Sequence, residues 1–183
     1  MVSKTGVSKK TSFSAEKAVM IAILTAIAAV SRVPFSMIPS VQPTTFVVIL
    51  SAIVFGGRTG FTVGALAAVT SNMFLVQGPW TVWQMVAWGG IGLFFGIFKE
   101  FFKRNKSALL ICGFISGILF GFFMNLWFLT EMYFESFWVA FFASVATSIY
   151  MDVAHGIANA VLLFFFFDRW YKILMRAKIK YGL

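Results

Sequence analysis

The chain has 183 residues, of which 60% are hydrophobic and only 11% are charged. A typical soluble domain has about 45–50% apolar and about 25% charged residues, and a chain this short cannot bury so large an apolar surplus within itself. The composition therefore excludes an ordinary soluble fold. It predicts one membrane domain over residues 1–183 whose surplus apolar surface faces lipid.

The net charge is +9, a value that many nucleic-acid-binding proteins share. Here the basic residues lie at the ends of apolar runs and at the two chain termini, not on a soluble face interleaved with aromatic side chains. Basic residues beside a membrane are attracted to anionic lipid headgroups. We therefore expect the lipid bilayer, and no nucleic acid, as the partner of these charges.

Six apolar runs, several of them close to the 20 residues that cross a bilayer, follow one another along the chain. They cover residues 18–33, 44–55, 60–76, 83–102, 107–129 and 137–167. The second and third are short enough to be buried helices instead of full spans. The last is long enough to be one tilted, overhanging helix, or to begin with an interfacial segment. The pattern predicts an all-α membrane protein with six transmembrane helices.

The distribution of basic residues predicts the orientation of these helices. With the N-terminus in the cytoplasm, six crossings place 14 of the 15 basic residues on the inner side, and only Arg32 lies on the outer side. Cytoplasmic loops carry the excess of Lys and Arg in membrane proteins, whereas five or seven crossings would put the basic C-terminus outside. We therefore expect both termini to be cytoplasmic, with basic tails at residues 1–15 and 171–183.

Reactive side chains are few. The one cysteine, Cys112, lies inside an apolar run, where a free thiol usually behaves as a small buried hydrophobic group. The one histidine, His155, excludes a two-histidine metal motif, and no Gly-x-Ser-x-Gly elbow is present. An intramembrane enzyme that pairs His155 with a serine remains a minor alternative. No metal site and no resident cofactor are predicted.

Polar residues inside a membrane are costly and are often functional. Asp152, His155 and Asn159 have the spacing i, i+3 and i+7, which places them on one face of the last helix. Three interpretations remain open: an interhelical hydrogen-bond network, contacts to a substrate, and a proton relay.

Two further patterns each have two interpretations. Six aromatic residues gather near the predicted outer boundary, where they form either an aromatic belt or part of a ligand site: Trp80, Trp83, Trp88, Trp127, Tyr133 and Trp138. A stripe of alanines on the first helix permits close backbone approach. That stripe serves either internal packing or the docking of another subunit.

Several of these segments resemble one family. They are the stripe Ala18-x-x-x-Ala22-x-x-x-Ala26, the stretch 38–45, the block 64–72, and the sequence Gln77-Gly78-Pro79-Trp80-Thr81-Val82-Trp83-Gln84-Met85. Together with the length and six predicted helices they resemble a substrate-binding S component of an energy-coupling factor (ECF) vitamin transporter, most closely the cobalamin type. The resemblance extends from Glu16 to Tyr171.

The resemblance implies a multi-pass protein of a bacterial cell membrane that binds a vitamin from outside. It implies two kinds of partner, a transmembrane coupling subunit and two cytoplasmic ATPases, so ATP is bound only by the partners. Such an S component topples in the membrane and releases its vitamin inside. Ala18, Ala22 and Ala26 match the positions that contact the coupling subunit.

The binding pocket of this family lies in the outer half of the molecule. Topology and residue type select Gln42, Thr44, Asn72, Gln77, Trp80, Trp83, Gln84, Trp88, Asn125, Trp127, Tyr133, Asp152 and His155. Aromatic walls with amide donors and acceptors suit a corrinoid such as cobalamin, held without a protein ligand on cobalt. They equally suit a flat purine-like or pterin-like compound such as a queuosine precursor, which is the first alternative. A structural subunit without its own ligand is another.

Overall fold

The computed structural model describes residues 15–38 and 40–183, and within these ranges the chain forms seven helices and no strand. The predicted N-terminal tail lies outside the described residues, apart from its last residue. The helices are α1 (Ala15–Phe35), α2 (Pro43–Phe55), α3 (Gly57–Leu75), α4 (Trp80–Ile97), α5 (Lys99–Arg104), α6 (Lys106–Glu131) and α7 (Phe137–Tyr181). The prediction of an all-helical fold is confirmed.

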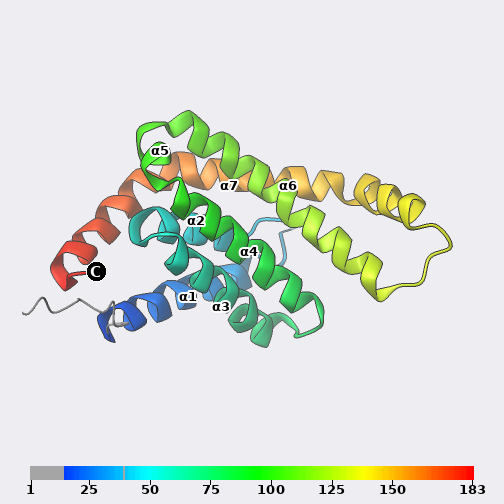
Figure 1. Cartoon of the computed structure of the whole chain (residues 1–183), viewed down its shortest axis with the longest axis horizontal. Coiled ribbons are helices and arrows are strands. Elements are labelled where there is room, and N and C mark those ends of the chain that lie inside the picture. The colour runs from blue at the N-terminus through cyan, green and yellow to red at the C-terminus, as the bar shows by residue number, and fades with distance from the viewer. Residues whose placement is uncertain (1–14, 39) are drawn as a thin grey trace, which may run out of the picture.

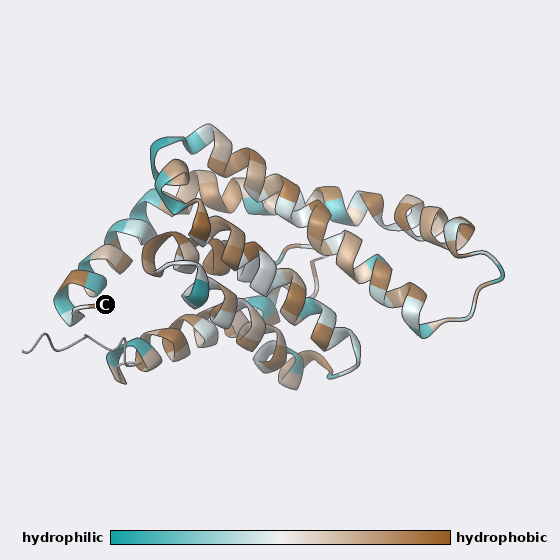
Figure 2. Ribbon diagram, in the orientation of Figure 1, coloured by the Kyte–Doolittle hydropathy of each residue, from teal (hydrophilic) through white to brown (hydrophobic). Residues whose placement is uncertain are grey.

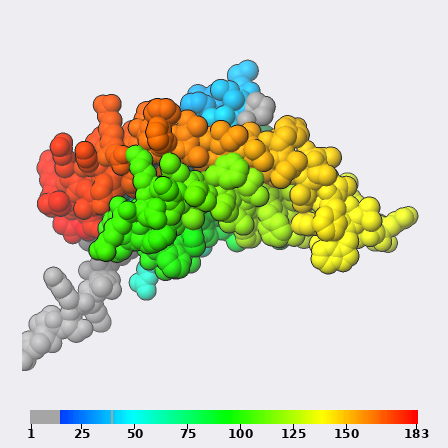
Figure 3. Space-filling model, turned by 90° about the horizontal axis from the view of Figure 1, so that it is seen from above, coloured from blue at the N-terminus to red at the C-terminus, as the bar shows by residue number. Residues whose placement is uncertain are grey.

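Two helix pairs form the frame of the molecule. Helices α3 and α4 pack along each other, and α6 and α7 form a long hairpin whose tip projects beyond the other helices (Figure 1). Seen from above, the hairpin tip also stands clear of the rest of the molecule (Figure 3). Hydrophobic residues occupy most of the helix surfaces, and hydrophilic residues gather at α5, at the C-terminal end of α7 and in the loops (Figure 2).

Helix α2 lies at the centre of the bundle. It has 13 residues, and every residue from Pro43 to Val54 is buried, because α1, α3, α4 and α7 pack around it. A helix enclosed in this way needs no lipid contact and need not match the bilayer thickness. The structure therefore favours the buried-helix interpretation of the second apolar run.

Four helices, namely α1, α4, α6 and α7, are long and apolar enough to cross a membrane. This confirms a multi-pass membrane protein. The 19-residue α3 and the 13-residue α2 account for the other two predicted crossings. The count of six crossings and the cytoplasmic location of both termini stay predictions.

The fourth apolar run differs from the expected single helix. Helix α4 begins at Trp80, directly after Pro79, whose fixed φ suits a helix start. It ends at Ile97, because Phe98 leaves the helical region with φ −94° and ψ 20°. The remainder of the run forms the separate helix α5, which carries the basic residues Lys103 and Arg104.

The last apolar run is one uninterrupted helix, as the overhanging-helix interpretation expected. The 45 residues of α7 span roughly 67 Å at the helical rise, about twice the hydrocarbon thickness. Its end packs on the bundle: Leu174 is buried, and Lys178 Nζ donates a hydrogen bond of 2.7 Å to the carbonyl of Val54, at the end of α2. Residues 171–181, predicted as a tail, are thus part of α7.

Glycines allow α3 and α4 to approach closely. Three glycines on each helix repeat at i, i+3 and i+7 and face the other helix: Gly57, Gly60 and Gly64 on α3, and Gly89, Gly92 and Gly96 on α4. A Cβ atom at Gly60 would lie 2.9 Å from the carbonyl oxygen of Gly92, and one at Gly64 would lie 2.6 Å from backbone atoms of Trp88. Any larger residue would push the two helices apart.

Gly92→Ala is expected to destabilise the protein by about 1–3 kcal/mol, the usual cost of overpacking a tight interface. The new methyl group would meet the backbone of Gly60, which cannot move aside as a flexible side chain can. Thermal unfolding of the purified protein measures the effect. Gly90→Ala is the matched control, because a Cβ at Gly90 meets nothing within 4 Å. Equal melting temperatures for the two variants would contradict the glycine interface.

Candidate functional site

Asn72, in the last turn of α3, is the centre of a buried group of polar side chains. It is 1% exposed. Its Oδ1 accepts a hydrogen bond of 2.7 Å from Arg32 Nη1, and its Nδ2 donates to Thr81 Oγ1 and to Gln84 Oε1, both at 2.8 Å. Arg32 Nη1 also donates to Ser71 Oγ at 2.8 Å. This one amide therefore joins α1, α3 and α4.

Trp88 extends the group to α2, α6 and α7. Its indole Nε1 donates to Thr45 Oγ1 at 3.0 Å, and the same hydroxyl is hydrogen-bonded to His155 Nε2 at 3.0 Å. The Arg32 guanidinium lies over the Trp88 ring, 5.1 Å from its centroid, and the Phe120 ring packs against Trp88 at 4.6 Å. One connected set of side chains therefore joins α1, α2, α3, α4 and α7, and Phe120 of α6 packs against it.

We call this set the polar cluster. It comprises Arg32, Thr45, Ser71, Asn72, Gln77, Thr81, Gln84, Trp88 and His155. A hydrogen-bonded network of this kind is rigid and holds its groups in one arrangement. Rigidity is the property that a recognition site needs, because the binding groups are then preorganised.

Arg32 lies on the inward face of α1 and does not extend away from the bundle. It continues a stripe of buried residues, Ile21, Thr25 and Ala28, at spacings of four, three and four. An Arg at the centre of a membrane helix costs about 2.5–3.5 kcal/mol on insertion scales, so such a residue is normally functional. The negative end of the helix dipole, at the C-terminus of α1, partly offsets this cost.

A second network lies between α6 and α7. Asn125 Oδ1 accepts from Ser144 Oγ at 2.6 Å, and Asn125 Nδ2 donates to Ser148 Oγ at 2.9 Å. Ser148 Oγ is in turn 3.0 Å from Asp152 Oδ2. Asn159 Nδ2 donates to the carbonyl of Gly113 at 3.3 Å. The hydrogen-bond interpretation of Asp152, His155 and Asn159 thus has direct support, and roles in substrate contact or proton transfer stay predictions.

The structure joins some predicted site residues to the polar cluster and separates others. Asn72, Gln84, Trp88 and His155 are central members, and Gln77 is linked through Thr81 at 2.9 Å. Asn125 and Asp152 belong to the second network. Thr44 is fully buried and donates to the carbonyl of Ala28 at 2.9 Å, which fastens α2 to α1.

The remaining predicted site residues belong to neither network. Trp80 and Trp127 meet edge to face with their centroids 5.5 Å apart, and Trp83 is half-buried. Trp127 Nε1 and Gln42 Oε1 are buried polar atoms without a hydrogen-bond partner among the described residues. Such atoms are unusual in folded proteins and can mark a place where a ligand or water binds. Tyr133 is 94% exposed at the hairpin tip.

The predicted docking alanines lie on the outer surface of α1. Ala22 and Ala26 are exposed and Ala18 is half-buried, while Ala28 and Ala29 face the core. The exposed part of the stripe therefore does not pack inside the molecule.

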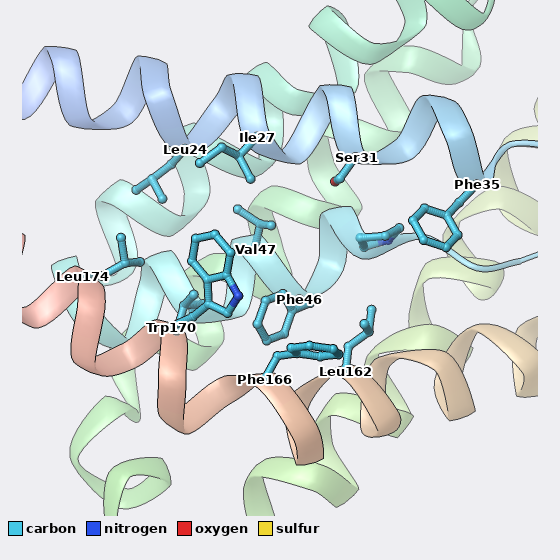
Figure 4. A pocket seen from close by; sticks show the side chains of 12 residues that line it. Leu24, Ile27, Ser31, Phe35, Phe46, Val47, Leu162, Phe166, Trp170 and Leu174 are labelled. Carbon is cyan, nitrogen blue, oxygen red and sulfur yellow. The ribbon is translucent and has the colours of Figure 1, made fainter.

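Three of the cavities in the described part of the chain are lined by residues outside the polar cluster. A groove of about 230 Å³ between α1, α2 and α7 is lined by apolar side chains such as Phe46, Phe166 and Trp170 (Figure 4). The hydroxyl of Ser31, which also lines it, is bonded to its own helix, so the groove offers little to orient a polar vitamin. A cavity of about 330 Å³ between α4 and α6 is also apolar and is lined in part by Cys112.

The third cavity has about 710 Å³ and lies at the tip of the α6–α7 hairpin. Its walls mix aromatic rings, among them Phe128 and Tyr133, with polar groups of Glu135, Ser144 and Thr147. Ser144 also belongs to the second network, so this cavity adjoins the hydrogen-bonded residues of α6 and α7.

Sequence reasoning missed several members of the two networks. Thr45, Ser71, Thr81, Ser144 and Ser148 were not among the predicted binding-site residues, because a hydroxyl in a membrane helix can always bond to its own backbone. Arg32 stood out in the sequence as the one basic residue on the outer side of the predicted topology, but it was not recognised as a site residue.

The fold and the polar cluster define the class of the protein, a helical membrane protein with a preorganised polar region between its helices. A family model described as "ECF-type riboflavin transporter, S component" matches residues 12–168. Because this match covers most of the chain, the chain belongs to the S components of bacterial ECF transporters. It is a multi-pass membrane subunit of a transporter and not an enzyme.

A curated relative is also similar to part of the chain. The chain is 29% identical over 98 residues to a "UPF0397 protein" of Vibrio atlanticus (strain LGP32), a match that covers 51% of this chain and 53% of the relative. The matched part thus spans about half the length of that relative. No solved structure matches the chain.

Proposed function

We propose that this S component binds a flat heteroaromatic vitamin of the riboflavin class, and that it takes up this vitamin together with an ECF module. The observation that carries the proposal is the Asn72-centred cluster, which joins amide and hydroxyl groups to the buried Trp88 ring through Arg32 and Thr45. An aromatic wall combined with a few fixed polar groups is the usual construction of a site for a small heteroaromatic ligand.

The family description supports the alternative expectation, a vitamin other than cobalamin, better than it supports cobalamin. A corrinoid is far larger than a flavin and would need a wide cavity beside the polar groups. We therefore place the riboflavin class first and keep cobalamin and a queuosine precursor as competitors in the test. For cobalamin, binding without Cys112 or His155 on cobalt stays a prediction.

The proposed mechanism follows from the predicted topology. Six crossings with both termini in the cytoplasm put the polar cluster toward the outer side, where a scavenged vitamin arrives. A transmembrane coupling subunit would dock on Ala18, Ala22 and Ala26, and two ATPases would drive release on the inner side. In this proposal the chain holds the vitamin without ATP and without a cofactor of its own.

Equilibrium binding of a panel of vitamins to the purified full chain, without ATP or partner subunits, tests the proposal. The panel contains riboflavin, FMN, cobalamin and a queuosine precursor base, titrated by tryptophan fluorescence. We expect riboflavin or FMN to bind with a Kd in the nanomolar range. Cobalamin and the queuosine precursor base should bind at least a hundredfold more weakly. Tight binding of cobalamin alone would refute the riboflavin class, and no binding at all would favour a structural subunit.

A further inference from the structure

Arg32 has a positive charge that no acidic side chain balances. None of the chain's six acidic residues forms an ion pair with it; the ion pairs among the described residues join Lys103 to Glu100 and Lys106 to Asp168. Its two hydrogen-bond partners, Ser71 Oγ and Asn72 Oδ1, are both neutral. A charge withdrawn from water in this way is normally paired with an opposite charge.

The Arg32 guanidinium also has N–H donors that no acceptor among the described residues occupies. Both of its hydrogen bonds to the protein use Nη1, although a guanidinium has five N–H groups. The groups on Nε and Nη2 have no acceptor among the described residues, and the Arg32 side chain is only half-buried. One edge of the guanidinium therefore has no partner among the described residues. This edge carries two parallel donors, which match two oxygens of a carboxylate or a phosphate.

The surrounding residues hold this edge in place. Trp88 supports one face of the guanidinium at 5.1 Å, and the indole is itself fixed by its hydrogen bond to Thr45. Ser71 and Asn72 fix Nη1 from α3. Arg32 therefore cannot turn toward solvent without breaking these contacts, so its open edge is preorganised.

We propose that Arg32 binds an anionic group, a carboxylate or a phosphate, of the transported vitamin. This inference rests on the proposed function and specifies the charge of its substrate. Within the riboflavin class the phosphorylated member, FMN, is then the better ligand. Arg32 supplies two parallel hydrogen bonds and the opposite charge, and the neutral amides of Asn72 and Gln84 hold the remainder of the cluster.

Matched pairs of neutral and anionic compounds test this assignment: riboflavin with FMN, pantothenol with pantothenate, and nicotinamide with nicotinate. For the pair that binds, we expect the wild-type chain to bind the anionic member at least tenfold more tightly. Arg32→Gln should remove this preference, because it should weaken binding of the anionic member at least tenfold more than binding of the neutral member. Arg32→Lys, which keeps the charge without the two-donor edge, should keep part of the preference.

The outcomes separate the two proposals. Equal or tighter binding of the neutral member by the wild-type chain overturns the inference alone. So does an equal loss of affinity for both members in Arg32→Gln, because a purely structural role would produce that result. If no compound of any pair binds to the wild-type chain, the proposed function fails and the inference fails with it.

Discussion

Asn72→Leu is expected to weaken vitamin binding at least a hundredfold, the largest loss that we expect from a substitution in the polar cluster. Leucine has nearly the same size but cannot accept from Arg32 or donate to Thr81 and Gln84. Arg32, Thr81 and Gln84 would lose the partner that holds them in one arrangement, and binding groups that are no longer preorganised bind more weakly; a hundredfold loss corresponds to about 2.8 kcal/mol. Titration of the purified variant with riboflavin and FMN measures the loss.

The control for Asn72→Leu must be a variant that destabilises the protein without changing a residue of the polar cluster. Leu109, near the start of α6, is 1% exposed and lies among apolar neighbours. Leu109→Ala should cost about 2–5 kcal/mol of stability through the cavity it creates. Its affinity for the vitamin should nevertheless equal that of the wild-type chain. If both variants lose affinity in proportion to their loss of stability, Asn72 has only a structural role.

Ala22→Trp is expected to abolish ATP-driven uptake and to leave vitamin binding unchanged. Ala22 is exposed on α1, and a tryptophan there would stand out from a surface that, in the proposed mechanism, must approach the coupling subunit closely. Helices in a membrane associate mainly through close packing, so a single large side chain suffices to prevent it. Uptake into cells that express the whole transporter measures the first effect, and titration of the purified chain measures the second.

Ile111→Trp is the matched control for this docking face. Ile111 is 60% exposed on α6, away from the alanine stripe, and the same substitution there should affect neither uptake nor binding. Loss of vitamin binding in Ala22→Trp would indicate that the stripe serves internal packing. Equal loss of uptake in both variants would indicate a general sensitivity of the membrane surface to added bulk.

The apolar runs of the sequence predicted the helices well, because a bilayer imposes a clear length and composition on whatever crosses it. They could not locate the break at Phe98, since the apolar pattern continues across it. The apolar runs also could not predict that α2 lies at the centre of the bundle. A run of 13 apolar residues looks the same whether its neighbours are helices or lipid, and only the packing of four helices around it decides.

The candidate site was predictable to the extent that its members are rare in membranes. Asn72, Gln84 and His155 stood out because amides and imidazoles are costly in hydrocarbon. The hydroxyl groups that connect them did not stand out. Arg32 was visible as an exception to the charge pattern, but its pairing with Asn72, 40 residues away, depends on the packing of α1 against α3 and could not be read from spacing.

The central claim is that the chain itself binds a vitamin on the outer side of the membrane. Binding of radiolabelled riboflavin and FMN to right-side-out and inside-out vesicles that contain the chain alone, without ATP, tests it most directly. The account predicts saturable binding of at least one of the two compounds to right-side-out vesicles, at one molecule per chain, and little binding to inside-out vesicles. Equal binding to both kinds of vesicle, or stronger binding to inside-out vesicles, would contradict it.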